Sequence, residues 1–367
     1  MRVIWFYRFT KIKSTMYFLH LPLLYFILNL FGTDPALEYS SSSAKAAASI
    51  TVDSVKTNGL AENLILQSKD GGQTWQDISA TLPENGQLHG FFAGETDIYL
   101  RVHDVMYRSS SHLKTPIWEK QSLPDHENTS IAFNPSGVMA YHFEGQVYRK
   151  KPSSETWLPL YAKSKNGLET VFEAASGDVF LGTQSGLYKS TDKGQNWKQV
   201  LNEGWVSGIV ESQGVLLGTA QKGIMRSADN GEHWEWVISE GGVGIAVERI
   251  DGGFAAISFD ARSQTRRIRI SKDGGKNWKA IDQPLPPSMS ITSIKQMGPY
   301  LLCGHPNGIF RSADLGRTWN VVHASLNKTE FRLVSVLNPA PSDAGKKVFR
   351  LFASGNTLYA VLNNSGC

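Results

Sequence analysis

Short apolar runs separated by glycine, proline and polar turn residues fill the chain from about residue 64 onward. Within one such stretch the pattern predicts four strands, at residues 169–174, 179–182, 187–190 and 197–201. The runs in the second-strand position, such as VLLG at 215–218, are apolar throughout, which is typical of strands covered on both faces. No segment carries the long 3.6-residue apolar period of a helix. The pattern therefore predicts an all-β fold with little helix.

One eight-residue element recurs within this pattern. Five intact copies of Ser-x-Asp-x-Gly-x-[Thr/Asn/His]-Trp are present: SKDGGQTW, STDKGQNW, SADNGEHW, SKDGGKNW and SADLGRTW. Two degenerate copies, SSSHLKTPIW and KKPSSETW, keep the terminal tryptophan. The seven tryptophans, at 75, 118, 157, 197, 234, 278 and 319, are separated by 43, 39, 40, 37, 44 and 41 residues. A period near forty with four short strands per unit predicts a β-propeller of seven four-stranded antiparallel blades.

The residue types of the element favour a hairpin turn that closes on itself. A short carboxylate can accept hydrogen bonds from turn N–H groups, and glycine supplies the positive φ of a tight turn. The tryptophan can bury a large apolar body between neighbouring blades. We therefore assign structural roles to Asp70, Trp75, Asp192, Trp197, Asp229, Trp234, Asp273, Trp278, Asp314 and Trp319. One carboxylate per copy is too few for a calcium site, so we expect no metal.

The two ends of the repeat region predict how the ring closes. The first intact copy is preceded by a single strand, at 64–67. The last segment, VFRLFASGNTLYAVLNNSG, aligns with the first two strands at 171–186. The C-terminal strands are thus expected to complete the blade begun by the N-terminal strands, which removes open sheet edges. Residues 48–367 are predicted to form one domain.

Residues 1–47 are predicted to be an export segment followed by a Ser/Ala-rich linker. Four basic residues and no acid precede the apolar run MYFLHLPLLYFILNLF at 16–31, as in a secretory signal. The apolar run of sixteen residues is shorter than a typical membrane-spanning helix, and Pro22 weakens it as a helix. This favours a cleaved signal, but no cleavage site is sharply placed. A cleaved signal and a retained anchor both stay open. We expect an exported protein, secreted or periplasmic, or held at the membrane by an uncleaved N-terminal segment.

Composition narrows the partners only slightly. The chain has 37 Lys and Arg against 33 Asp and Glu, a net charge of +4, and no basic run. A charge this small argues against nucleic acid as a partner. Its two cysteines are too few for a disulfide framework, and Cys303, in an apolar run, is expected to be buried. We expect a monomer without a cofactor.

The recurring element resembles the Asp-box, or BNR, repeat of sialidase-like propellers, and the resemblance covers residues 64–367. In blade number, box pattern and N-terminal segment the chain is similar to seven-bladed photosystem II assembly factor-like propellers, and it also resembles Vps10-like propellers. The resemblance implies that the Asp-box turns lie on one rim. It also implies that a ligand site would use the opposite face, formed by loops between second and third strands and loops between blades.

The chain supplies many polar side chains to those loops. The ligand-binding candidates are His103, His142, Trp205, Lys222, Arg262, Arg266, Arg267, His305 and Arg332. Asp104 and Glu144, in loops of adjacent blades, are weak candidates for catalytic acids. The connector at 327–347 is some nineteen residues longer than its counterparts. Its length is equally compatible with a binding loop and with a surface insertion that has no role in binding.

Two functional hypotheses follow. The first is an exported, non-catalytic propeller that binds a protein or a glycan through the face opposite the Asp-boxes. The alternative is a glycoside hydrolase, sialidase-like or another exo-glycosidase. A sialidase of the resembled family would need three arginines, a tyrosine nucleophile and its glutamate partner, and six blades. Residues 48–67 contain no arginine, so the family's motif before the first box is missing. A different glycosidase needs two facing carboxylates, such as Asp104 and Glu144.

Overall fold

The computed structural model describes residues 65–82, 88–123, 129–151, 154, 156–160, 167–326 and 346–364. The predicted export segment and linker, Arg332, Cys367 and nearly all of the 327–347 connector lie outside these residues. Within the described part of the chain, no helix is long and apolar enough to cross a membrane.

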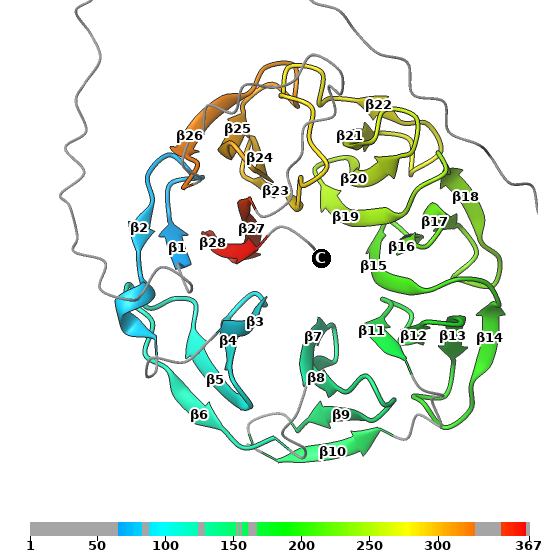
Figure 1. Cartoon of the computed structure of the whole chain (residues 1–367). Coiled ribbons are helices and arrows are strands. Elements are labelled where there is room, and N and C mark those ends of the chain that lie inside the picture. Colours follow the sequence, from blue (N-terminus) through cyan, green and yellow to red (C-terminus); the bar gives the residue numbers. More distant parts are fainter. Residues whose placement is uncertain are drawn as a thin grey trace, which may run out of the picture. The chain divides into compact units, whose positions relative to one another are not determined.

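The described strands form seven four-stranded antiparallel sheets, which are the blades of a propeller (Figure 1). Blade 1 consists of β27 (Lys347–Ser354), β28 (Thr357–Asn364), β1 (Ile65–Ser68) and β2 (Gln76–Asp77). Blade 2 consists of β3 (Leu88–Ala93), β4 (Asp97–Val102), β5 (Val105–Ser110) and β6 (Glu119–Gln121). Blade 3 consists of β7 (Ser130–Asn134), β8 (Gly137–Tyr141), β9 (Val147–Lys150) and β10 (Trp157–Leu160).

The remaining blades also use four consecutive strands each. Blade 4 consists of β11 (Leu168–Glu173), β12 (Val179–Thr183), β13 (Gly186–Ser190) and β14 (Lys198–Leu201). Blade 5 consists of β15 (Val206–Ser212), β16 (Val215–Ala220), β17 (Gly223–Ser227) and β18 (Glu235–Ile238). Blade 6 consists of β19 (Gly244–Ile250), β20 (Gly253–Asp260), β21 (Thr265–Ser271) and β22 (Lys279–Ala280). Blade 7 consists of β23 (Ser293–Met297), β24 (Tyr300–His305), β25 (Gly308–Ser312) and β26 (Asn320–Ala324).

Blade 1 joins the two ends of the repeat region, as predicted. Strand β28 pairs antiparallel with β1, with Ile65 opposite Val361 and Ser68 opposite Leu358. Strand β27 pairs with the other edge of β28. The predicted all-β, seven-bladed fold and its closure are therefore confirmed. The only helix among the described residues is the short 3-10 turn Ser79–Thr81, in line with the expected scarcity of helix.

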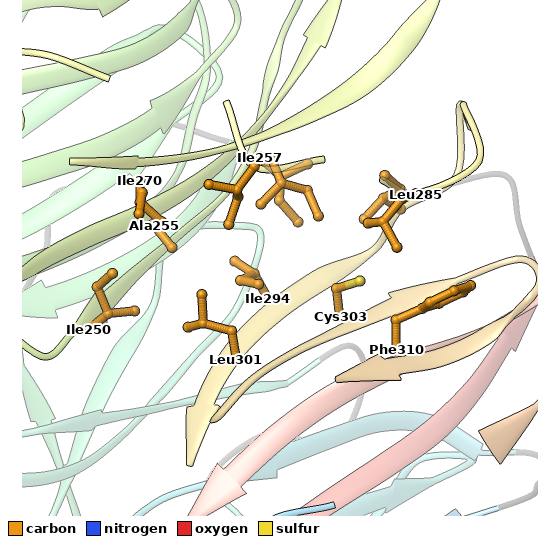
Figure 2. Close-up of a cluster of buried hydrophobic side chains, with 12 residues drawn as sticks. Ile250, Ala255, Ile257, Ile270, Leu285, Ile294, Leu301, Cys303 and Phe310 are labelled. Carbon is orange, nitrogen blue, oxygen red and sulfur yellow. The ribbon is translucent and has the colours of Figure 1, made fainter. Parts of the chain in front are cut away.

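The hydrophobic core consists of clusters between neighbouring blades rather than one central cluster. Second strands such as β12 and β24 are buried along nearly their whole length, because a neighbouring blade covers each of their faces. Figure 2 shows one cluster, in which Ile257 of blade 6 lies near Ile294, Leu301 and Cys303 of blade 7. Cys303 is fully buried, as predicted, and burial raises the pKa of its thiol. Cys303 therefore acts as a small apolar side chain.

The intact repeat copies form turns that are closed by their own side chains. In the copy of blade 4, the Asp192 carboxylate accepts hydrogen bonds from Asn196 N at 2.8 Å and Asn196 Nδ2 at 2.7 Å. The Ser190 hydroxyl accepts the N–H of Gly194 at 2.8 Å, and Gly194 has a φ of 92°. The Trp197 indole donates to Gly194 O at 3.0 Å. We call these five elements the Asp-containing turns.

The contribution of the Asp192 carboxylate to stability can be tested, because it depends on pH. Hydrogen bonds from the Asn196 backbone and side chain lower the pKa of Asp192 to about 2. The unfolded-state pKa is about 3.9, so the stabilisation is complete above about pH 4 and is lost as pH falls toward the folded pKa. Asp192→Asn should lower the Tm at pH 7 and shrink the Tm difference between pH 7 and pH 3. Asp104→Asn, outside the turns, is the control; an unchanged difference in Asp192→Asn would contradict the assignment.

Candidate functional site

In blades 2 to 7, the links between second and third strands leave the sheet at the end opposite the Asp-containing turns, because neighbouring strands are antiparallel. The links to the next blade leave at the same end. We call this side the link face. Its second-to-third strand links are residues 103–104, 142–146, 184–185, 221–222, 261–264 and 306–307. The innermost strands, β27, β3, β7, β11, β15, β19 and β23, surround the centre of the ring (Figure 1).

Most of the residues predicted from the sequence lie at the link face but are spread around the ring. His103 and Asp104 belong to blade 2, His142 and Glu144 to blade 3, Trp205 and Lys222 to blade 5, Arg262, Arg266 and Arg267 to blade 6, and His305 to blade 7. Trp205 precedes β15 and is partly buried. The set is therefore divided among five blades.

The guanidinium groups of Arg266 and Arg267 already have partners within the protein. Arg266 donates from Nη1 to the carbonyl of Ile291 at 3.0 Å. Arg267 donates from Nε to the Asp282 carboxylate at 2.6 Å, and this bond raises the pKa of Arg267. Only Arg262 of the three has an exposed side chain. Arg266 and Arg267 therefore connect β21 to the segment that follows blade 6.

Two of the predicted histidines are buried and hydrogen-bonded. The Nε2 atom of His305 lies 3.0 Å from Pro286 O, and its Nδ1 accepts the N–H of Asn307 at 3.0 Å. This arrangement requires a neutral ring that donates from Nε2. His142 is 5% exposed, and its Nδ1 lies 3.5 Å from Thr129 Oγ1. Both rings hold links in place.

The other predicted side chains are exposed. Lys222 forms an ion pair with Glu203 in the preceding connector. His103 has a φ of 49°, and its ring meets the ring of His89 edge-on with centroids 5.8 Å apart. Asp104 and Glu144 are exposed on separate links. Among the described residues, no group of three or more His, Cys, Asp or Glu side chains could hold a metal ion.

Four innermost strands carry a β-bulge at their second residue, at the link-face end. The register shifts around His89 in β3, Glu169 in β11, Ser207 in β15 and Ile245 in β19. A bulge bends its strand and turns one side chain away from the regular pleat, often beside functional sites. These positions carry no signal in the sequence, because an extra residue in a short strand leaves no periodic pattern.

Tyr141 lies beside Glu169 and within electrostatic reach of Arg350, and none of the three has a distinguishing signal in the sequence. The Tyr141 hydroxyl donates to the Glu169 carbonyl at 3.2 Å, and Gln184 Nε2 lies 3.5 Å from the Glu169 carboxylate. Burial raises the pKa of Tyr141 to about 12, while Arg350 opposes this increase through its charge. Arg350 on the innermost strand β27 therefore acts electrostatically on blade 3.

The charge of Arg350 has no counter-ion among the described residues. Its side chain is exposed, yet the protein around it partly desolvates the guanidinium and lowers its pKa. Its guanidinium lies over the ring of Phe352, 5.7 Å from the ring centroid. No described carboxylate forms an ion pair with it. The inner wall of the ring thus presents a cation that is open to an incoming anionic group.

Comparison with known proteins supports the fold. No protein-family model matches the sequence, and the search of curated proteins gave no match. A GH74 xyloglucanase from Xanthomonas campestris is 17% identical, with a TM-score of 0.53, over 72% of this chain and 53% of that one. An ancestral GH74 enzyme is 12% identical, with a TM-score of 0.54, over 82% of this chain and 45% of that one.

A third similar structure is Ycf48 bound to a D1 peptide. It is 16% identical, with a TM-score of 0.51, over 78% of this chain and 95% of the Ycf48 chain. The present chain spans about half the length of each GH74 structure and nearly all of Ycf48. At these identities the likeness concerns the propeller fold and not the activity.

Proposed function

We propose that this protein is a non-catalytic binding protein that recognises a segment of another protein through the link face and the inner wall of the ring, where Arg350 lies. The observation that carries the proposal is Arg350, an exposed cation on the innermost strand with no ion-paired acid among the described residues. A guanidinium binds a carboxylate through paired hydrogen bonds, so an acidic side chain or chain end suits it. The peptide bound to Ycf48, which shares this fold over nearly its whole length, supports a peptide rather than a glycan as ligand.

The chemistry near Arg350 favours binding over catalysis. With a pKa of about 12, the Tyr141 phenol stays protonated at neutral pH and is a weak nucleophile. Its hydroxyl donates to the backbone carbonyl of Glu169, whereas activation would require a base to accept the proton. This tyrosine therefore lacks the environment that a sialidase nucleophile needs.

Selection of random displayed peptides on the wild-type protein tests the proposal. We expect enrichment of a peptide family carrying a carboxylate, and a labelled member should bind Arg350→Gln at least tenfold more weakly, because one charge-assisted contact contributes about 1.5–3 kcal/mol. Fluorescence anisotropy gives the affinities. Arg249→Gln is the matched control, since Arg249 is an exposed arginine of another innermost strand, β19. Equal affinities of wild type and Arg350→Gln would refute the site.

A glycoside hydrolase remains the second candidate, because Asp104 and Glu144 lie on links of adjacent blades and two similar structures are GH74 enzymes. A panel of fluorogenic glycosides decides between the two functions. Hydrolysis that is lost in Asp104→Asn or Glu144→Gln would replace the binding proposal with a glycosidase. No hydrolysis together with carboxylate-dependent peptide binding would support the binding protein.

A further inference from the structure

A hollow of about 570 Å³ lies on the outer side of the ring, between blades 6 and 7. Apolar side chains of Ile270, Ile281, Pro284 and Leu315 line it, and the cations Lys279 and Arg317 stand with them. We call it the seam hollow. Its volume falls in the range of ligand pockets, about 300–1,000 Å³. It lies at the Asp-containing turn of blade 7, outside the link face.

The turn of blade 7, which lines the seam hollow, is anchored differently from the turns of the other intact copies. In the other four intact copies the tryptophan indole donates to the glycine carbonyl of its own turn, at 2.9–3.1 Å. The Trp319 indole instead donates to Ile281 O, in the connector after blade 6, at 2.8 Å. Strand β22 has only two residues, so the chain leaves the blade early and Ile281 covers Gly316. The floor of the hollow is therefore fixed by hydrogen bonding.

The presence of a leucine at position 315 is not explained by the stability of the turn. Its φ is 57°, in the left-handed region that large side chains rarely adopt. The equivalent positions in the other intact copies carry glycine or a polar residue, namely Gly71, Lys193, Asn230 and Gly274. The Leu315 side chain is also 39% exposed. An apolar side chain that is both strained and exposed points to a contact surface.

The charged side chains around the seam hollow indicate the charge of the group that would bind there. Lys279 and Arg317 are exposed, and neither forms an ion pair with a described residue. Asp314 is the acid of the same turn, but its carboxylate already accepts hydrogen bonds from Thr318 N at 2.8 Å and Thr318 Oγ1 at 2.7 Å. The groups free to meet a partner are therefore two cations beside an apolar floor.

We propose that the seam hollow is a docking site for an extended acidic segment of a partner protein. One apolar side chain of the segment packs on Leu315 and Pro284, which are both exposed, and flanking Asp or Glu side chains pair with Lys279 and Arg317. Apolar burial supplies the affinity and the charge pairs set the orientation. This site is independent of the link face, so either can exist without the other.

Leu315→Asn separates binding from stability, because the two effects have opposite signs. Asparagine tolerates the left-handed conformation and occupies the equivalent position at Asn230, so the Tm should rise by about 2 °C. Displayed random peptides selected on the wild type should include sequences with an apolar residue flanked by acids. A fluorescein-labelled peptide of that class should bind Leu315→Asn at least tenfold more weakly by anisotropy. Arg317→Gln should weaken binding of the same peptide about threefold at low salt and reduce the salt dependence of that binding.

Lys193→Asn, at the same turn position in blade 4, is the matched control and should leave peptide affinity unchanged. The proposal fails if no acidic apolar sequence is enriched on the wild type, or if the selected peptide binds Leu315→Asn and wild type equally. A peptide whose binding is lost in Arg350→Gln but kept in Leu315→Asn would count against the seam hollow and for the link face.

Discussion

Truncation of the chain after Asn356 should prevent the ring from folding. The truncation removes β28, which lies between β27 and β1 in blade 1. Its buried side chains include Leu358, Tyr359 and Val361, at 0%, 0% and 3% exposure. Each large buried apolar side chain contributes about 1.5–3 kcal/mol, while a whole domain is stable by about 5–15 kcal/mol. The loss therefore approaches the total stability of the ring.

Circular dichroism and urea unfolding measure this result. The truncated protein should lose cooperative unfolding, because β1 and β2 no longer connect to the rest of their blade and β27 keeps an open edge. Tyr359→Phe is the mild control. It removes only the hydroxyl that accepts a hydrogen bond from Gln67 Nε2 at 3.3 Å, and should cost about 1 kcal/mol. A truncated protein that unfolds cooperatively at the wild-type midpoint would show that the ring does not depend on this closure.

Lys189→Met should cause the largest loss of stability among single substitutions of charged residues in blades 4 and 5. Lys189 lies 3.0 Å from Asp178 Oδ2 and 2.6 Å from Glu232 Oε1, and its side chain is 4% exposed. Asn230, in the turn of blade 5, also donates to Asp178 at 2.6 Å. The cluster thus joins blade 4 to the turn of blade 5. Removing the cation leaves a buried carboxylate unpaired, which costs about 3–5 kcal/mol.

Lys198→Met is the matched control for Lys189→Met. Lys198 pairs with the same acid, Glu232, at 2.9 Å, but its side chain is 70% exposed. Exposed ion pairs contribute about 0.2–1 kcal/mol, so the control should unfold nearly like the wild type. Urea unfolding at pH 7 gives both values. Equal losses in the two variants would show that burial does not set the strength of this cluster.

The fold was predictable because its signals are local and repeated. The third strand of blade 4 was predicted at 187–190 and is observed at Gly186–Ser190. Each signal lies within a few residues of the feature it produces. Glycines such as Gly194 supply the positive φ of a turn, and the carboxylate of the same turn accepts its N–H groups. The second strands are short apolar runs. Seven tryptophans spaced at intervals near forty residues then predict the number of blades.

The candidate site was only partly predictable, because a side chain's availability depends on distant partners. Arg267 and Arg350 are the same residue type, but Asp282 pairs with Arg267, while no described acid pairs with Arg350. His305 was selected as a ligand-binding candidate, and its ring hydrogen-bonds to Pro286 O, nineteen residues away in the chain. Glu169 has no signal in the sequence, because the bulge that displaces it follows from pairing with β12.

The sequence by itself determined the ring of seven blades and its closure through β28 and β1, since each blade is built from short-range turns and apolar runs that repeat. Only the tertiary structure decided which charged and apolar groups stay open to a partner. Arg350 and Leu315 stand at strand and turn positions that other blades also contain. Exposure depends on packing between blades, which buries or half-buries most side chains of the inner strands and leaves Arg350 and Leu315 exposed.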